Sequence, residues 1–254
     1  MLFPPTLPSQ LRQTRHLVVF TGAGVSQESG IPTFRDALTG LWAQFDAEQL
    51  ATPEAFAADP ELVWGWYEWR RGLVLRKEPN AAHRAIAELA QKVPRLTLIT
   101  QNVDGLHERA GSRDPLSLHG SLHRPYCSTC GRRHRLPDGL PDLVEGGARL
   151  PPPECSACGG LVRPGVVWFG EALPGAAWEQ AEAAVCECDL LFSVGTSSLV
   201  YPAAQLPHQA AQSGAQVVQI NPASTSLDSV CAFNVRGSAA QVLPELVACA
   251  WPAV

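Results

Sequence analysis

The chain has 254 residues, of which 46% are hydrophobic and 17% charged, and its net charge at pH 7 is −5. This composition can bury a sizeable core, which excludes an intrinsically disordered chain. The acidic balance excludes an overall positive field that would draw the protein to nucleic acid or anionic lipid. The length exceeds one minimal domain and falls short of two ordinary ones, so we expect a large domain with a smaller inserted module.

The first sixteen residues lack the charged-then-apolar pattern of a secretory signal, and no apolar run reaches the roughly 18 residues that a membrane span requires. We therefore expect a cytoplasmic protein without membrane contact. Disulfides are rare in that compartment. The eight cysteines are then expected to be metal ligands, nucleophiles or buried apolar side chains.

Short apolar runs rich in β-branched residues predict buried parallel strands at 17–20, 96–100, 190–194 and 217–220. Helical patterns lie between them, at 81–91, 176–186, 203–213 and 239–250. This alternation predicts an α/β fold with a Rossmann-like parallel sheet. All four strands end in small or polar residues, and we expect the ligand site at these carboxyl ends.

Two segments interrupt the alternation. Residues 37–79 are helical and rich in aromatic residues, whereas residues 121–163 are rich in Pro and Gly and carry two cysteine pairs. We expect both to be insertions that together form a small domain. The Rossmann-like domain would then comprise residues 1–36, 80–120 and 164–254.

The two cysteine pairs have the spacing of a zinc site, because Cys127-x2-Cys130 and Cys155-x2-Cys158 are separated by 24 residues. Four thiolates close a tetrahedral shell, so one structural zinc in a zinc-ribbon insertion is expected. Four unconnected buried thiols are the plain alternative. A zinc ribbon that binds nucleic acid is another, favoured by the basic run at 132–135 and opposed by the net charge. The remaining cysteines are expected to be buried apolar side chains: Cys186, Cys188, Cys231 and Cys249.

Glycines follow the first strand, where Gly22 and Gly24 would let the backbone approach a pyrophosphate. The third glycine of a GxGxxG motif is replaced by Gln27. The second strand ends in Gln101 and Asn102 rather than in an acidic residue. These departures disfavour a dehydrogenase that transfers hydride. The absence of a GxxxxGK[ST] loop disfavours ATP or GTP hydrolysis.

Several motifs in one order resemble the sirtuins, the NAD-dependent protein lysine deacylases, from about residue 10 to residue 250. They are GAGVS at 22–26, SGIPTFR at 29–35, TQNVDGLH at 100–107, the His119-Gly120 pair, the four cysteines, GTS at 195–197 and the Asn221-Pro222 pair. The resemblance implies that NAD lies across the carboxyl ends of the strands. An acyl-lysine would enter between the two lobes, and the products would be nicotinamide, 2′-O-acyl-ADP-ribose and free lysine.

The resemblance also implies residue roles. His119 matches the general base, and imidazole is the side chain that titrates near neutrality. Gln101, Asn102 and Asp104 match residues that act with it on the ribose and the nicotinamide amide. Phe34 would shield the reactive ribose carbon. The implied NAD contacts are Gly22, Ala23, Gly24, Ser26, Ile31, Phe34, Arg35, Gln101, Asn102, Asp104, Gly195, Thr196, Ser197, Asn221, Pro222 and, by position alone, Ala239.

The substrate peptide is expected to bind as an added β-strand between two extended segments, 165–171 and 198–202. The implied contact residues are Val167, Trp168, Phe169, Gly170, Glu171, Leu199, Val200 and Tyr201. Gly165 departs from the histidine that many class III members carry there, and the 36–40 segment departs from the usual cofactor loop.

Tyr67 and Arg70 are three residues apart on a predicted helix and so share one face. A Tyr-x-x-Arg at this place resembles class III sirtuins, which remove succinyl, malonyl and glutaryl groups, and a guanidinium pairs well with a terminal carboxylate. Ala47 matches a small residue that widens the same pocket, whereas Arg71 points about 100° away. The plain alternative is a partly buried helix whose arginine extends to solvent.

The sequence thus predicts a class III sirtuin that removes acetyl groups and also succinyl or malonyl groups from lysine. A protein ADP-ribosyltransferase on the same scaffold is the first alternative. A silent NAD-binding or zinc-ribbon interaction module is the second, and the intact Gln101, Asn102, Asp104 and His119 argue against it.

Overall fold

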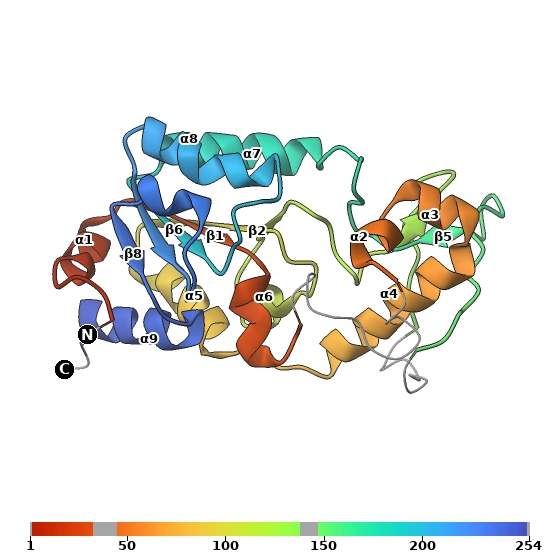
Figure 1. Cartoon of the computed structure of the whole chain (residues 1–254), viewed down its shortest axis with the longest axis horizontal. Helices are drawn as coiled ribbons and strands as arrows, with labels where there is room; N and C mark the ends of the chain where they lie inside the picture. Colours follow the sequence, from red (N-terminus) through yellow and green to blue (C-terminus); the bar gives the residue numbers. More distant parts are fainter. Residues whose placement is uncertain (1, 33–44, 138–146, 253–254) are drawn as a thin grey trace.

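The computed structural model describes residues 2–32, 45–137 and 147–252. Six parallel strands form one sheet in the order β3-β2-β1-β6-β7-β8, and a separate antiparallel pair, β4-β5, lies at the far end of the molecule (Figure 1). The large sheet consists of β1 (His16–Thr21), β2 (Arg95–Thr100), β3 (Leu116–Ser117), β6 (Leu190–Val194), β7 (Gln216–Ile220) and β8 (Phe233–Val235). The predicted α/β fold with a parallel sheet is confirmed.

The strand order reverses at β1. From β1 the chain moves outward to β2 and β3 and then returns to the other side of β1, where it adds β6, β7 and β8. The carboxyl ends of β1 and β6 therefore lie side by side with Thr21 opposite Val194. Such a switch point is where open α/β sheets bind ligands.

Helices cover both faces of the sheet (Figure 1). The alternating side chains of β1 divide between two cores: Leu17 and Val19 pack with the helices of one face, and Val18 and Phe20 with those of the other. The first face carries α1 (Leu7–Gln13), α5 (Ala81–Lys92) and α9 (Ala239–Ala250), and the second carries α7 (Gly175–Glu187) and α8 (Leu206–Gln212). The central strands β1 and β6 are thus buried on both sides, as their continuous apolar runs predict.

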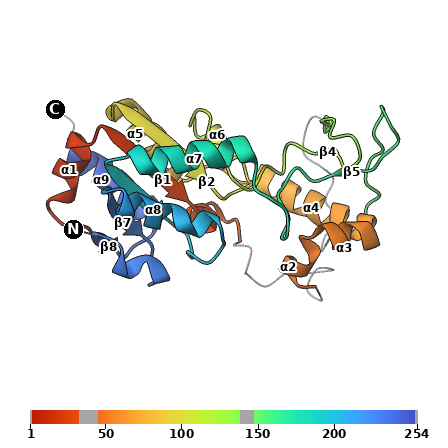
Figure 2. The same cartoon turned by 90° about the horizontal axis from the view of Figure 1, so that it is seen from above.

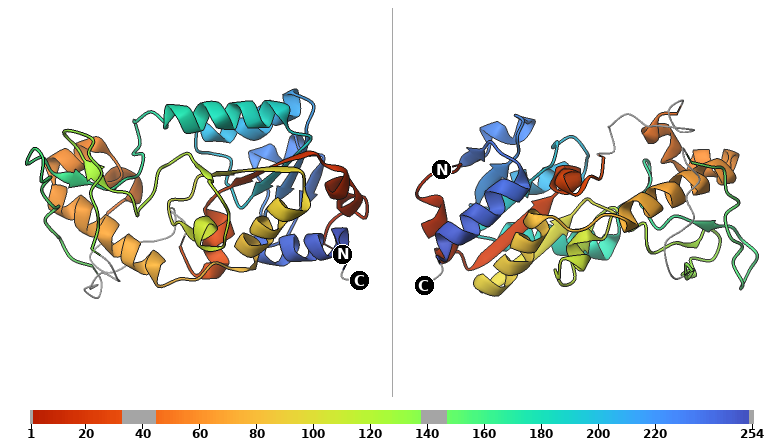
Figure 3. Two further views of the ribbon diagram at one scale, coloured as in Figure 1. Left: turned by 180° about the vertical axis from the view of Figure 1, so that it is seen from behind. Right: turned by 90° about the horizontal axis from the view of Figure 1, so that it is seen from below.

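A group of three helices lies at the end opposite both chain termini (Figures 2 and 3). These are α2 (Ala47–Leu50), α3 (Pro53–Ala58) and α4 (Pro60–Leu75), accompanied by the short pair β4 (Tyr126–Cys127) and β5 (Val162–Arg163). Asp46, Thr52 and Asp59 cap the three helices by accepting backbone N–H bonds. The helical prediction for 37–79 is confirmed where the chain is described, from residue 45 onward.

A third hydrophobic cluster joins the helices of this end to residues far along the chain. Phe56, Trp66 and Tyr67 pack with Val166 and Trp168. The remaining short elements are η1 (Ala23–Ser29), α6 (Leu106–Arg109), η3 (Ala203–Gln205) and η4 (Ser226–Ser229). Within the described part of the chain, no helix has both the length and the apolar character needed to cross a membrane.

Candidate active site and metal centre

Two glycine loops touch at the switch point of the sheet. The Gly24 N–H donates to the Gly195 carbonyl over 2.8 Å, which joins the loop after β1 to the loop after β6. Gly195 has a φ of +59°, and a Cβ placed on it would lie 2.4 Å from the backbone nitrogen of Val25. A side chain at this position would collide with the backbone, and residues other than glycine rarely adopt this positive φ. The predicted glycines therefore bring two backbones into contact at the edge where a ligand is expected.

Ser26 is the centre of a buried hydrogen-bond network. Its hydroxyl donates to Asp104 Oδ2 over 2.8 Å and accepts from Asn102 Nδ2 over 3.1 Å. His83 Nε2 lies 3.4 Å away on the other side. On its far side, His83 Nδ1 lies 3.3 Å from the Asn80 backbone nitrogen and 3.1 Å from Asn80 Oδ1. Three predicted site residues, Ser26, Asn102 and Asp104, are thus held in one fixed arrangement.

Burial raises the pKa of Asp104, and hydrogen bonds from the Leu106 N–H and the Ser26 hydroxyl partly oppose this effect. The carboxylate is 5% exposed and receives the Leu106 N–H on its second oxygen over 2.9 Å. His123 Nε2 donates to the Asp104 carbonyl over 2.9 Å, which fixes the backbone as well. Asp104 is therefore held in place at both its side chain and its main chain.

His119 is oriented by a backbone carbonyl. Its Nδ1 lies 3.0 Å from the carbonyl oxygen of Gln101, and this oxygen can only accept, so Nδ1 carries the proton. Nε2 is then left with its lone pair, as a general base requires. Burial lowers the pKa of His119, and the bond to Gln101 partly opposes this shift. The imidazole is thus neutral and ready to accept a proton at neutral pH.

The side chains after β2, β6 and β7 meet at the same edge. Gln101 Nε2 donates to Thr196 Oγ1 over 3.1 Å, and Asn221 Nδ2 donates to the Thr196 carbonyl over 2.8 Å. Thr196 therefore links Gln101 to Asn221 across the sheet. Ser197 and Pro222 lie in the loops after β6 and β7, whereas Ala23 begins η1, after β1.

Four other predicted NAD contacts lie away from this group of side chains or outside the described residues. Phe34 and Arg35 lie outside the described residues, and Ile31 packs against the cluster of the helical end. Ala239 begins α9, and its methyl group is buried in the core beneath the sheet. The neighbouring helix N-terminus is capped from η1, because Glu28 accepts the Ser238 hydroxyl and the Ala240 N–H. Only the backbone of Ala239 remains to face a ligand.

The predicted acyl-pocket residues share one buried cluster. Ala47 and Tyr67 are 8% and 4% exposed and belong to the same group of side chains as Trp168. Arg70 is half-buried, and its guanidinium lies 5.0 Å from the ring centroid of Trp66. Burial lowers the pKa of Arg70, while the nearby Tyr67 and Asp104 raise it. Arg70 thus lies in the electrostatic field of both the acyl-pocket tyrosine and the carboxylate of the sheet edge.

Arg71 serves a different purpose from Arg70. It forms a two-bond ion pair with Glu68, at 2.7 and 2.9 Å, and is 5% exposed. We expected Arg71 to point about 100° away from Arg70 around the helix, and its pairing with Glu68 agrees with this expectation.

The segment after β5 runs beside His119. The Val167 N–H donates to the His119 carbonyl over 2.9 Å, and Val166 pairs antiparallel with Gly120. The N–H groups of Trp168 and Phe169 also donate within the chain, to the Glu171 carboxylate and to the Ala51 carbonyl oxygen. The N–H groups of three successive residues of this segment are thus used within the chain.

Gly165 permits a close approach that no other residue would. A Cβ at this position would lie 2.0 Å from the Arg124 carbonyl oxygen, and the Ser121 N–H donates to the Gly165 carbonyl over 2.8 Å. The departure from the family's histidine is thus accompanied by direct backbone packing of 121–124 on this segment. On the second predicted segment, Leu199 and Tyr201 are 59% and 64% exposed, and Phe169 on the first is 43% exposed.

Glu171 was predicted to contact substrate, but its carboxylate is occupied within the chain. It pairs with Arg163 through two bonds, at 2.5 and 2.8 Å, and accepts the Trp168 N–H over 2.8 Å. Arg163 is 7% exposed, and its guanidinium carbon lies 3.4 Å from the Trp168 ring centroid. Arg163 was not singled out from the sequence, although its place two residues before Gly165 belongs to the same motif.

Two buried histidines were also missed. The His83 and His107 rings lie 4.8 Å apart, and both are fully buried. Thr21 donates to Thr100 over 2.9 Å and therefore accepts from His107 Nε2 over 3.0 Å. Burial lowers the pKa of His83 to about 4 and that of His107 to about 3. The helical pattern at 81–91 marks His83 as inward-facing, but no sequence signal reveals its contact with His107.

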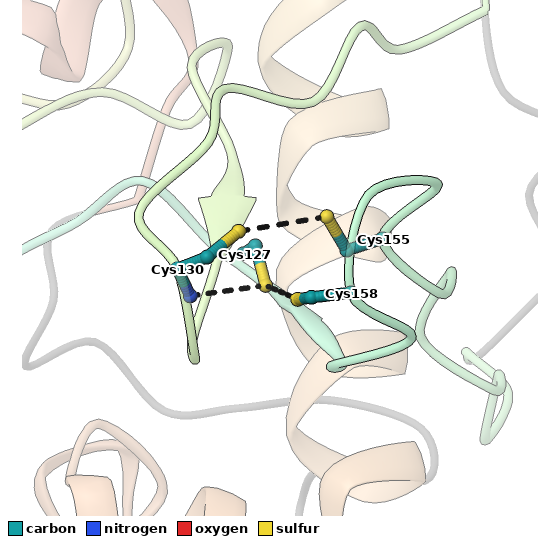
Figure 4. Close-up of side chains that lie close together, drawn as sticks. All are labelled: Cys127, Cys130, Cys155 and Cys158. Atoms are coloured by element: carbon teal, nitrogen blue, oxygen red, sulfur yellow. Dashed lines mark hydrogen bonds between the residues drawn. The ribbon is translucent and has the colours of Figure 1, made fainter.

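The four predicted zinc ligands converge at the end of the β4-β5 pair (Figure 4). The sulfur atoms of Cys127, Cys130, Cys155 and Cys158 lie within 4.8 Å of one another, with Cys127 to Cys158 at 3.5 Å and Cys130 to Cys155 at 3.7 Å. A tetrahedral zinc with Zn–S bonds of about 2.3 Å requires sulfur atoms about 3.8 Å apart. The donor set and its dimensions therefore fit one zinc ion.

The backbone around the first cysteine pair favours the thiolate. The N–H groups of Cys130 and Thr129 point at Cys127 Sγ, at 3.5 and 3.4 Å, and lower the pKa of this thiol to about 6. Metals bind the thiolate form. Cys155 and Cys127 are buried, while Cys130 and Cys158 are exposed.

The prediction for the other cysteines is half wrong. Cys188 is buried and Cys231 is half-buried, but Cys186 and Cys249 are exposed. The reason is helix periodicity. Ala181, Ala184 and Val185 form the buried face of α7, and Cys186, the next residue along the helix, lies off that face. Cys249 is likewise displaced from the buried stripe of α9.

Comparison with known proteins agrees with this geometry. A family model described as the Sir2 family matches residues 22–202. An NAD-dependent protein deacylase of Methylococcus capsulatus is 64% identical over 247 residues, which cover 97% of each protein. A solved Sir2 homologue in complex with NAD gives a TM-score of 0.89 at 44% identity, covering 97% of this chain and 93% of that chain.

A more distant solved structure, of a Sir2 protein with a p53 peptide and NAD+, gives a TM-score of 0.80 at 31% identity and covers 94% of both chains. The family model spans more than half of the chain, and the Methylococcus relative aligns along nearly all of it. The sequence motifs, the switch-point glycines and the four-cysteine cluster fall inside these matches. The chain belongs to the Sir2 family.

Proposed function

We propose that this chain is an NAD-dependent protein-lysine deacylase that yields nicotinamide, 2′-O-acyl-ADP-ribose and free lysine. The observation that carries the proposal is His119 at the carboxyl edge of the sheet, with Nδ1 bound to the Gln101 carbonyl and the Nε2 lone pair left for a proton. The relatives named as NAD-dependent deacylases support the same reaction.

NAD would bind across the touching glycine loops and supply the ribose carbon from which nicotinamide leaves, together with the hydroxyl that receives the acyl group. His119 Nε2 accepts the proton that this hydroxyl loses. Gln101, tied to Thr196, and Asn102 and Asp104, tied through Ser26, present amide and carboxylate groups to the ribose and the carboxamide. Because neighbouring side chains already hold these groups, little reorganisation accompanies the reaction.

The four cysteines would hold one structural zinc, which closes its own coordination shell and takes no part in the chemistry. We also propose the domain division given by the sequence. Residues 1–36, 80–120 and 164–254 would form the NAD-binding domain, and 37–79 with 121–163 the small domain.

The acyl-lysine peptide would add as a β-strand between 165–171 and 198–202. The N–H groups of Val167, Trp168 and Phe169 already donate within the chain. On the first segment, the peptide N–H groups would therefore donate to carbonyl oxygens of the segment. Main-chain recognition of this kind gives low selectivity for the side chains that flank the acyl-lysine. The exposed Phe169, Leu199 and Tyr201 would cover apolar side chains of the peptide.

Succinyl and malonyl groups would be removed in addition to acetyl. Tyr67 and Arg70 lie in the same end of the molecule as Ala47, and the guanidinium of Arg70 is coupled electrostatically to both Tyr67 and Asp104. A terminal acyl carboxylate bound by Arg70 and the Tyr67 hydroxyl would therefore be close to the reaction edge. Charged hydrogen bonds of this kind are the strong ones.

Mass spectrometry of the products tests the reaction. The wild-type protein is incubated with NAD and an acetyl-lysine or succinyl-lysine peptide, and we expect free lysine and acyl-ADP-ribose in equal amounts. Transfer of ADP-ribose to the peptide or to a protein, without acyl-ADP-ribose, would instead establish the ADP-ribosyltransferase alternative. Unchanged NAD with every peptide would establish the silent binding module.

A further inference from the structure

Trp168 is held by contacts with Glu171, Arg163 and Phe56. Glu171 accepts its backbone N–H over 2.8 Å, and the Arg163 guanidinium lies 3.4 Å from the centroid of its ring. The same Glu171 carboxylate binds Arg163 through two hydrogen bonds, so both contacts are linked. The indole is 3% exposed and also packs on Phe56, with the ring centroids 5.4 Å apart.

The remaining polar atom of this indole is directed at the acyl pocket. Trp168 Nε1 donates to the Tyr67 hydroxyl oxygen over 3.1 Å, although the two residues are 101 positions apart in the sequence. Both side chains are buried, at 3% and 4% exposure. Burial raises the pKa of Tyr67 to about 12, which keeps its proton in place at neutral pH.

The direction of this hydrogen bond determines what Tyr67 can do. An indole N–H can only donate, so the tyrosine oxygen accepts and its proton turns to another group. Among the described residues, no acceptor for that proton is found. Arg70, three residues along the same helix, places positive charge beside it. The pocket thus offers one O–H donor and one guanidinium, both complementary to a carboxylate.

We propose that Trp168 is a specificity-determining positioning residue: its indole N–H directs the Tyr67 proton toward the terminal carboxylate of an acidic acyl group on lysine. This inference rests on the proposed function, since it concerns the same acyl pocket. The Glu171–Arg163 pair holds the indole in the orientation that the contact requires. Selectivity for acidic acyl groups then depends on five residues from two distant segments, rather than on Tyr67 and Arg70 alone.

The test compares kcat/KM for succinyl-lysine and acetyl-lysine peptides in the wild type and in Trp168→Phe, which keeps an aromatic ring but loses the N–H. We expect the succinyl-to-acetyl ratio to fall on the order of tenfold, mainly through a higher KM for the succinyl peptide, because a hydrogen bond to a charged group is weakened. Trp178→Phe, on α7 outside the pocket, is the matched control and should leave the ratio unchanged.

A double variant separates positioning from general packing. In a Tyr67→Phe background, Trp168→Phe should lower the ratio no further, because the hydroxyl that it positions is already gone. If Trp168→Phe fails to fold, benzothienylalanine in place of Trp168 removes the N–H with almost no change of shape, and the same fall is expected.

Equal losses on both peptides, or a further fall in the double variant, would overturn the role of Trp168 while leaving the deacylase and its acyl preference intact. A wild-type protein that deacetylates but does not desuccinylate would overturn the proposed acyl preference and this inference with it. A wild-type protein inactive on both peptides would overturn the deacylase function itself. The three failures are therefore distinguishable.

Discussion

The carboxyl edge of the sheet and the zinc-bearing end of the molecule are built in opposite ways. At the sheet edge, Ser26, Asn102 and Asp104 follow buried parallel strands whose register fixes them, and they bind one another. At the other end, the described residues form regular sheet structure only in the two-residue strands β4 and β5. There the four cysteines and an aromatic cluster hold the chain segments together.

This difference shows two sources of order within one site. The sheet edge obtains its geometry from the packed sheet, whereas the side chains around Tyr67 and Trp168 are held by local contacts such as the Arg163–Glu171 ion pair. The two regions should therefore fail under different conditions. Metal removal should act on the zinc-bearing end and acid on the sheet edge.

Loss of the metal is expected to have the largest effect. Cys155→Ser, or treatment with a strong chelator, should release the zinc and unfold 126–137 and 147–163, because a structural zinc contributes on the order of 10 kcal/mol to its module. Deacylation should be nearly abolished while the sheet stays folded. Zinc analysis and hydrogen exchange resolved by segment would measure both effects.

Cys186→Ser replaces an exposed cysteine of α7 and serves as the control, with zinc content and activity unchanged. Unaltered exchange at 147–163 in zinc-free, fully active protein would show that the metal does not organise this end.

Acid is expected to act on the sheet edge through His83 and His107. Their folded-state pKa values, about 4 and about 3, lie below the ordinary value of 6.5, so the unfolded chain binds more protons. Stability is therefore complete above about pH 7 and falls as the pH drops below 6.5, by about 2 kcal/mol for each histidine between pH 8 and pH 5. Urea unfolding at the two pH values would measure the loss.

His107→Gln should lower stability at pH 8 but roughly halve the acid-induced loss. His208→Gln, on α8 outside this network, should preserve the full loss. A His107→Gln protein as acid-sensitive as the wild type would exclude the buried pair as the cause.

The acyl pocket should respond more modestly to a single change. Arg70→Met is expected to lower kcat/KM for a succinyl-lysine peptide by tens-fold while affecting the acetyl-lysine peptide much less, because one charge-assisted contact is lost. Steady-state kinetics on both peptides would measure this. Arg76→Met, at the exposed end of the same helix, should change neither value. Equal losses on the two peptides with Arg70→Met would remove Arg70 from acyl recognition.

Much of the sheet edge could be predicted because its signals are local. Apolar runs predicted four of the strands, and the small and polar residues after them predicted the edge at which Gly24 and Gly195 are found in contact. β3 and β8 were missed because they are two and three residues long, too short for a pattern to emerge. The cysteine spacing likewise predicted the metal cluster, since ligand geometry restricts the sequence directly.

The contacts that could not be predicted join distant segments. Nothing near Trp168 indicates that its N–H meets Tyr67, and nothing near Glu171 shows that its charge is used by Arg163. The contact between the His83 and His107 rings depends in the same way on how α5 packs against α6. Such pairs arise from tertiary packing, which one sequence does not encode in a short pattern.

The central claim is that His119 acts as the base of an NAD-dependent deacylation. Its most direct test is the rate of acyl-ADP-ribose formation by His119→Ala, with NAD and a succinyl-lysine peptide, against the wild type. Removal of a general base should lower this rate by about 10²- to 10⁴-fold. Product formation by His119→Ala at the wild-type rate would contradict the account.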